Sequence, residues 1–205
     1  NISKIAHVPY IGFHLNKKSL NKKTIIKNSE FLKSFLKSNK KYYGDIIDVK
    51  QDKNTYFNNL YWSYPKDSIL SIIIPTKDKL NLLKKCLSSI ERYKPGISIE
   101  IIIVNNGSKE NLTLRYFDKF RRENYKNIPT KIINIPGDFN FSRLNNIASK
   151  SINGNVILML NNDVHFIKEG WGNKLAQNAL RSDIGCVGAK LFFDDMTIQH
   201  GGIIM

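Results

Sequence analysis

From residue 69 onward, short apolar runs alternate with segments whose apolar residues recur at helical spacing. The apolar runs predict buried strands at residues 69–74, 97–104, 131–135 and 156–160. The segments between them predict helices over residues 110–123 and 142–152, and a first helix that starts at an Asp78 cap and carries Leu80, Leu83, Leu87 and Ile90 on one face. Strands this uniformly apolar, separated by helices, indicate an α/β fold with a mostly parallel central sheet covered on both faces.

The first 65 residues follow a different pattern. Apolar residues at helical spacing within Phe31–Leu36 predict one amphipathic helix with Ser29 as its N-cap. The aromatic residues of Tyr56–Tyr64 predict an extended strap packed on a larger body. We therefore divide the chain into a basic helical and extended segment, residues 1–65, and a larger domain, residues 66–205.

The composition excludes several classes of protein. Of the 205 residues, 41% are hydrophobic, which is enough apolar surface for a core and excludes a disordered chain. No apolar run approaches the roughly 18 residues that a membrane-spanning helix needs, and the first residues show no secretory signal. The two cysteines, Cys86 and Cys186, lack metal-binding spacing and lie in apolar patterns, so we expect both to be reduced core thiols.

Positive charge is in excess, because 32 lysines and arginines stand against 17 acidic residues and give a formal charge of +15. The excess is densest in residues 1–65, where 12 lysines face 4 acids. A nucleic acid, an anionic membrane surface or phosphorylated substrates would each match such a charge. An AT-rich genome, whose codons favour lysine, explains the excess of positive charge equally well, because a surface lysine needs no partner. Charge alone therefore leaves the partner open.

Polar clusters follow three of the predicted strands, at the strand ends where parallel sheets bind their ligands. They are Pro75–Asp78, Asn105–Ser108 and Asn161–Asp163. No GxGxxG, GxxxxGK[ST], GxSxG or HExxH motif is present, which removes dehydrogenases, P-loop proteins and the common hydrolase and zinc classes. The chemistry of this chain is therefore expected at the three polar clusters.

Asp163 emerges shortly after the apolar run at residues 156–160. A carboxylate in this place can bind a divalent cation that keeps water and phosphate oxygens as its other ligands. We therefore predict an Mg²⁺ or Mn²⁺ site at Asp163. A strand-end aspartate that only caps the next helix is the alternative.

The succession of these motifs resembles family 2 glycosyltransferases, and in particular bacterial enzymes that build O-antigen and other cell-surface polysaccharides. The resemblance covers about residues 69–205 and rests on four segments: Ser71–Asp78, Glu100–Ser108, Asn140–Asn146 and Leu160–Val164. It implies the GT-A fold, a Rossmann-like nucleotide-binding domain, and inverting transfer of a sugar from a nucleotide-diphosphate donor to a glycan or lipid-linked acceptor. It also implies a cytoplasmic location, with peripheral contact at the inner face of the cell membrane as an open option.

The resemblance assigns roles to eight residues. It implies nucleotide contacts by Pro75, Thr76, Lys77, Asn105, Asn106, Arg143 and Asn162, and a metal contact by Asp163. Arg143 would approach the diphosphate or the base, because a planar fork of donors suits phosphate oxygens. Many relatives carry an acid at Asn105 or Asn106, so the nucleotide preference stays open.

Inverting transfer needs a general base, which the family places downstream of the metal motif. Asp194 and Asp195 fit a turn between strands better than the role of general base, so we expect the base beyond Met205. We therefore expect this chain to bind the donor and the metal but to transfer sugar poorly. A start at Asn1 agrees with a fragment of a longer, tandem enzyme, whose preceding module would close with residues 7–15. One alternative is a catalytically inert donor-binding module. The other is a basic nucleic-acid-binding protein, and the motifs disfavour this second alternative.

Two further residues have two interpretations each. His200 would be either an additional metal ligand or a pocket-wall or hydrogen-bonded structural histidine. Trp171 would be either part of the core or a stacking platform for an acceptor sugar. For both residues we favour the structural interpretation.

Overall fold

The computed structural model describes residues 22–51 and 58–201. The chain divides into two compact units, Asn1–Trp62 and Ser63–Met205, which are described one at a time. The segment at residues 7–15 and the start of the predicted aromatic strap at Tyr56 lie outside the described residues. In the described part of the chain, no helix combines the length and the apolar character that a membrane span requires.

The described part of the first unit contains two helices and a two-stranded antiparallel sheet: α1 (Lys22–Ser38), α2 (Lys40–Tyr43), β1 (Ile46–Gln51) and β2 (Asn58–Trp62). Leu36 of α1 packs with Ile46, Val49 and Trp62 from the two strands. Part of the predicted extended strap is therefore the strand β2, which pairs with β1.

The predicted N-cap of the first helix is wrong. Ser29 lies inside α1, which begins at Lys22. Residues 22–28 contain neither glycine nor proline, so no helix-breaking residue stops the helix before Ser29, and a serine is tolerated in a helix interior.

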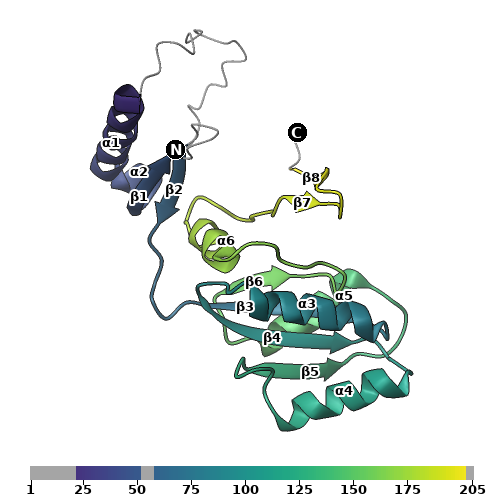
Figure 1. The fold of residues 1–205 in the computed structure, drawn as a ribbon. Helices are drawn as coiled ribbons and strands as arrows, with labels where there is room; N and C mark the ends of the chain where they lie inside the picture. The colour runs from purple at the N-terminus through teal and green to yellow at the C-terminus, as the bar shows by residue number, and fades with distance from the viewer. Residues whose placement is uncertain (1–21, 52–57, 202–205) are drawn as a thin grey trace. The chain divides into compact units, whose positions relative to one another are not determined.

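The second unit is built on a four-stranded parallel sheet in the order β5-β4-β3-β6. Its strands are β3 (Ile69–Thr76), β4 (Ser98–Asn105), β5 (Thr130–Asn134) and β6 (Val156–Met159). Because all four are parallel, their carboxyl ends meet along one edge of the sheet (Figure 1). The predicted strands and the parallel sheet are confirmed.

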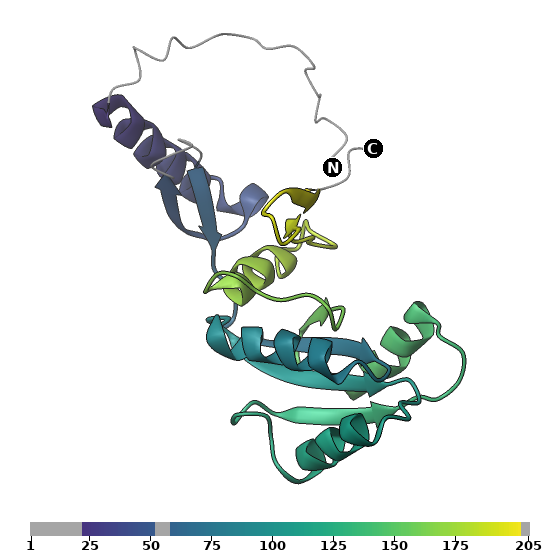
Figure 2. The same cartoon turned by 45° about the vertical axis from the view of Figure 1, so that its right-hand side comes forward.

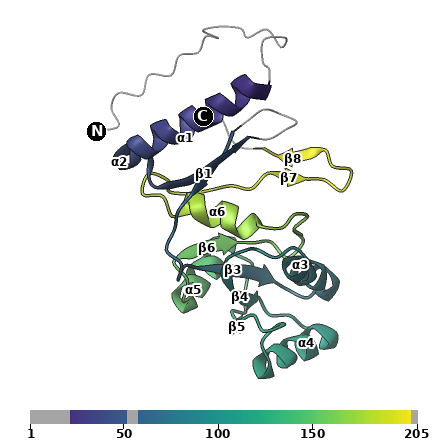
Figure 3. The same cartoon turned by 60° about the vertical axis from the view of Figure 1, so that its left-hand side comes forward.

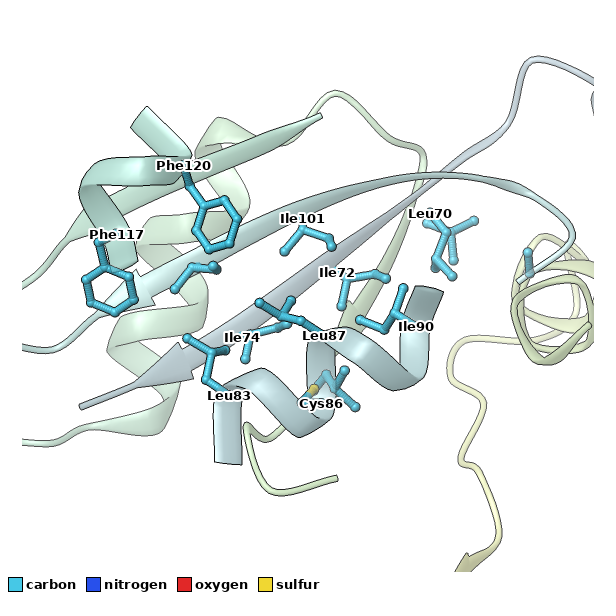
Figure 4. Close-up of a cluster of buried hydrophobic side chains, with 14 residues drawn as sticks. Leu70, Ile72, Ile74, Leu83, Cys86, Leu87, Ile90, Ile101, Phe117 and Phe120 are labelled. Atoms are coloured by element: carbon cyan, nitrogen blue, oxygen red, sulfur yellow. The ribbon is translucent and has the colours of Figure 1, made fainter. Parts of the chain in front are cut away.

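Helices cover both faces of the central strands: α3 (Leu80–Arg92), α4 (Asn111–Arg122), α5 (Phe141–Ala148) and α6 (Trp171–Ala179). On one face, apolar side chains of α3 and α4 meet the isoleucines of β3 and β4, as Figure 4 shows for Leu83, Leu87 and Phe117. On the other face, Leu144 and Ala148 of α5 pack on the sheet. In the view of Figure 3, α5 and α3 are seen apart from each other. α4 runs beside β5 (Figure 2). The expected two-sided cover is thus confirmed for β3 and β4.

A short antiparallel hairpin, β7 (Leu191–Phe192) and β8 (Ile198–His200), follows α6. In its turn, Asp195 Oδ1 accepts hydrogen bonds from the amide and the hydroxyl of Thr197, as a turn residue would. Cys86 is buried as predicted, but Cys186 is exposed, so the prediction of a second core thiol is wrong. Cys186 lies in an irregular segment between α6 and the hairpin, so its apolar pattern does not belong to a helix or strand of the core.

Candidate functional site

The three polar clusters predicted at strand ends are brought together by the sheet. Thr76 and Asn105 occupy paired positions at the ends of β3 and β4, and the amide of Asn106 donates to the carbonyl of Thr76 at 2.9 Å. From the other side, Asn162 Nδ2 donates to Thr76 Oγ1 at 2.8 Å. Pro75 is buried beneath this point, whereas Lys77 is exposed next to it. Thr76 therefore joins the ends of three segments that lie far apart in the sequence.

The loop after β3 is held by an aspartate in an unusual backbone conformation. Asp78 and Lys79 have φ angles of 52° and 53°, in the left-handed region where aspartate and asparagine are better tolerated than most residues. Asp78 Oδ1 accepts hydrogen bonds from the amides of Lys109 and Glu110, both at 2.8 Å, and its own amide donates to Ser108 Oγ at 2.8 Å. The carboxylate therefore stabilises the start of α4.

The predicted role of Asp78 as the cap of its own helix is consequently wrong. The N-cap position of α3 is Lys79, and no side chain caps it. The left-handed backbone turns Asp78 toward the loop after β4, where two free amides precede α4. Asp78 thus ties the first polar cluster to the second.

Asp78→Ala is expected to lower the free energy of unfolding of the larger unit by about 2 kcal/mol, because it removes a helix cap and places an alanine in the left-handed region. Asp78→Asn keeps an acceptor oxygen, and asparagine also tolerates the left-handed conformation, so its loss of unfolding free energy should be less than about half that of Asp78→Ala. Urea unfolding measures both, with Asp67→Ala, an exposed carboxylate at the other end of β3, as the control. Equal losses for Asp78→Ala and Asp78→Asn would contradict the capping role.

The amides of Asn105 and Asn106 are engaged inside the protein. Asn105 Oδ1 accepts the amide of Ser108 at 2.8 Å, and its Nδ2 donates to Asn134 Oδ1 at 3.0 Å. Asn106, only 1% exposed, donates from Nδ2 to the carbonyls of Ile135 and Gly137. These two residues therefore shape the loops after β4 and β5, and their contact with a base stays a prediction.

Arg143 lies in the first turn of α5, near the same edge of the sheet. Asn140 caps this helix, because its Oδ1 accepts the amide of Arg143 at 2.8 Å. The Arg143 side chain is exposed, and its Nη1 lies 3.8 Å from the position that a Cβ would take at Gly137. Gly137 also accepts a hydrogen bond from Asn106, so the loop between β5 and α5 connects the Arg143 guanidinium to the second polar cluster.

Asp163 lies on a turn directly after β6, in which the amide of Val164 donates to the carbonyl of Asn161 at 3.3 Å. Its carboxylate is exposed and makes no hydrogen bond or ion pair with any described residue. Cys86 lies below the turn. Burial, and next the charge of Asp163, raises the pKa of the Cys86 thiol to about 12, so this thiol is protonated at neutral pH.

A free, exposed carboxylate fits a divalent cation that takes its remaining ligands from water and phosphate. Residues 22–51 and 58–201 contain no group of three or more histidine, cysteine, aspartate and glutamate side chains that could hold a metal by themselves. Asp163 would therefore share a cation with a phosphorylated ligand. The alternative of a simple helix cap finds no support, because the N-cap of α6 is Gly170.

Trp171 has the surroundings of a core residue, whereas the role of His200 stays a prediction. The Trp171 ring stacks on Phe166 at 3.6 Å between ring centres, and its Nε1 donates to the carbonyl of Tyr93 at 2.7 Å. His200 is partly buried in β8. The structure thus supports the core interpretation of Trp171.

Sequence reasoning missed three residues that organise this unit. Glu100 is a buried carboxylate inside β4, Asn134 is the partner of Asn105, and Ser89 is a buried hydroxyl on α3. Two of these residues could have been found from the sequence. Glu100 is a charged residue inside the apolar run at 97–104, and Asn134 is a polar residue inside the run at 131–135. Ser89 gave none, because serine is common on either face of a helix.

Comparison with known proteins identifies the family. The model of the family described as "Glycosyl transferase family 2" matches residues 71–200. The chain is 35% identical over 162 residues, 79% of its length, to "Uncharacterized protein y4gI" of Sinorhizobium fredii (strain NBRC 101917 / NGR234). It is 30% identical over 138 residues, 66% of its length, to "O-antigen biosynthesis protein RfbC" of Myxococcus xanthus. The matches span only 18% and 10% of these two relatives.

Among solved structures, mannosyltransferase PcManGT from Pyrobaculum calidifontis, in complex with GDP-Man and Mn²⁺, is similar over 80% of this chain and 44% of its own. The TM-score is 0.51 at 13% sequence identity, a likeness that concerns the fold alone. Together with the parallel four-stranded sheet, it confirms the predicted GT-A, Rossmann-like architecture. Because the family model covers well over half of the chain, the chain belongs to glycosyl transferase family 2.

Proposed function

We propose that this chain binds a nucleotide-diphosphate sugar at the carboxyl edge of its parallel sheet and serves sugar transfer in the synthesis of a cell-surface polysaccharide. The observation that carries the proposal is the meeting of Thr76, Asn105 and Asn162 at one edge, beside the free carboxylate of Asp163. Family membership supports the transferase class. The name of the RfbC relative supports a cell-surface polysaccharide as the product. The proposed acceptor is a glycan or a lipid-linked carrier.

Each site residue has a proposed task. Pro75 and Thr76 form the wall against which the nucleobase lies, and the exposed Lys77 and Arg143 offset the charge of the diphosphate. Asn105 and Asn106 hold the loops that border the base, and Asn105 keeps a second Nδ2 hydrogen that it can donate toward the base. Asn162, fixed by Thr76, is placed to meet the ribose or the sugar.

Asp163 is the proposed ligand of Mn²⁺ or Mg²⁺. When bound, such a cation would offset the charge that develops on the leaving nucleoside diphosphate during inverting transfer. The general base is assigned to none of the described late acids, because Asp195 is engaged in the hairpin turn and Asp194 lies in the same turn.

Thermal denaturation with UDP, GDP, CDP and dTDP, each with and without Mn²⁺, tests the proposal. At a concentration about 100 times the Kd, a bound nucleotide stabilises the protein by about 2.7 kcal/mol, which raises Tm by about 5 to 10 °C for a chain of this size. We expect at least one nucleotide to give this rise with Mn²⁺, and Asp163→Ala to remove the part of the rise that depends on Mn²⁺.

Asp67→Ala is the matched control, since it removes an exposed carboxylate at the opposite end of β3. It should keep the full response to metal and nucleotide. The proposal would be wrong if no nucleotide changed Tm, or if Asp163→Ala responded to Mn²⁺ as the unmodified chain does.

A further inference from the structure

The segment that carries Asp163 runs along α3 and is hydrogen-bonded to it in sequence order. At the middle of α3, Cys86 Sγ lies 3.9 Å from the carbonyl of Asn161. One turn later, Ser89 Oγ accepts the amide of Phe166 at 3.0 Å. Beyond the helix end, the carbonyl of Lys94 accepts the amide of Gly170 at 2.8 Å. The helix that follows the first polar cluster therefore also holds the segment of the third.

Ser89 is the buried polar member of this series. It is 7% exposed, and its hydroxyl donates to the carbonyl of Cys86 at 2.7 Å while accepting the amide of Phe166. Because the hydroxyl has one proton, donation to the Cys86 carbonyl leaves its lone pairs directed at the amide. The Phe166 ring is fixed as well, by its stack on Trp171. Ser89 thus sets where the chain lies three residues after Asp163.

The position of the Asp163 carboxylate depends on its backbone, since no described residue bonds the carboxylate itself. Upstream, the amide of Leu160 donates to the carbonyl of Ile73 at 2.9 Å. Inside the turn, Asn162 is held by Thr76. Downstream, the first hydrogen bond to a neighbouring element is the one from Phe166 to Ser89. The turn is therefore fixed to β3 on one side and to α3 on the other.

We propose that Ser89 is a positioning residue for the cation site: it touches neither cation nor nucleotide, but it fixes the downstream end of the turn that presents Asp163. This proposal rests on the proposed function, in which Asp163 is the metal ligand. Groups that orient a metal ligand typically contribute 10- to 100-fold to metal affinity. Loss of the Ser89 hydroxyl should therefore weaken Mn²⁺ binding while leaving metal-free nucleotide binding nearly unchanged.

The test titrates Mn²⁺, alone and with the nucleoside diphosphate selected by the thermal screen, and follows free Mn²⁺ by electron paramagnetic resonance. Ser89→Ala should weaken Mn²⁺ binding between about 10- and 100-fold. Ser89→Thr, which keeps the hydroxyl, should restore most of it. Ser88→Ala is the matched control, because the neighbouring Ser88 is exposed and its hydroxyl donates only to the carbonyl of Lys85 at 2.9 Å.

If Ser89→Ala fails to fold, Ser89→Cys replaces it in the test. The thiol fills the place of the hydroxyl, but it is only a weak acceptor for the amide of Phe166. A loss of Mn²⁺ affinity in Ser89→Cys, with Ser88→Ala unchanged, supports the proposal. Unchanged Mn²⁺ affinity in a folded Ser89 variant overturns it, even if Tm falls, since a merely structural serine would lower stability alone. If Asp163→Ala also kept its Mn²⁺ affinity, the proposed function would be the part that failed.

Discussion

Glu100→Ala is expected to lower the free energy of unfolding of the larger unit by about 4 kcal/mol, because the buried Ser71 hydroxyl and the partly buried donors of Asn153 and Gly154 lose their acceptor. Glu100 is 3% exposed. Its Oε1 accepts the hydroxyl of Ser71 at 2.7 Å and the amides of Asn153 and Gly154, and its Oε2 accepts Asn153 Nδ2 at 2.8 Å. The carboxylate therefore fixes the turn from which β6, and with it Asp163, begins.

Urea unfolding, read by amide hydrogen exchange in β3 and β4, measures this loss in the larger unit by itself. Glu169→Ala is the control, because Glu169 is an exposed carboxylate of the same unit. Its effect should stay within about 0.5 kcal/mol. A similar result for both variants would show that the Glu100 network contributes nothing to stability.

The same carboxylate predicts a dependence on pH. Burial raises the pKa of Glu100, but the hydrogen bonds from Ser71, Asn153 and Gly154 outweigh it and hold the pKa below the usual 4.5. Because the folded-state pKa lies below the unfolded one, the stabilisation is full above the usual value and is lost as the pH falls through the folded pKa. The stability gap between the unmodified chain and Glu100→Gln should therefore be constant from pH 7 to about 5.5 and narrow below pH 4.5. A gap that widens on acidification would contradict the assignment.

Gly154→Ala is expected to cost about 3 kcal/mol or more, because there is no room for a side chain at this turn. A Cβ at Gly154 would collide with the carbonyl oxygen of Ile69 and with Ser71 Oγ. Moving the backbone to relieve the collision would break the hydrogen bonds of the Gly154 amide to Ser71 Oγ, at 3.0 Å, and to Glu100 Oε1, at 3.1 Å.

Gly185→Ala is a matched control for this substitution. A Cβ at Gly185 meets no atom within 4 Å, so its free energy of unfolding should change by less than about 0.5 kcal/mol. The same urea experiment compares the two variants. Equal stability of Gly154→Ala and Gly185→Ala would mean that the turn before β6 can move at little cost.

The local pattern of the sequence determined the elements of the larger unit. β3, β4, β5 and β6 lie where short apolar runs predicted strands, and the apolar face predicted for α3, including Leu83, Leu87 and Ile90, is buried. Such periodicity needs no knowledge of neighbours, because burial of one face imposes it on each element separately. The polar residues at strand ends were visible for the same reason, since they interrupt these runs.

Which residues meet was decided only by the tertiary structure. Asp78 caps α4 instead of α3 because the backbone turns it toward a loop 30 residues away, and Glu100 gains its partners Asn153 and Gly154 only because β6 is placed beside β3. The order of strands, and therefore the contact of Thr76 with Asn162, follows from how whole elements pack. A sequence pattern repeats over a few residues, whereas these contacts join segments 30 to 90 residues apart, so they exist only once the sheet has formed.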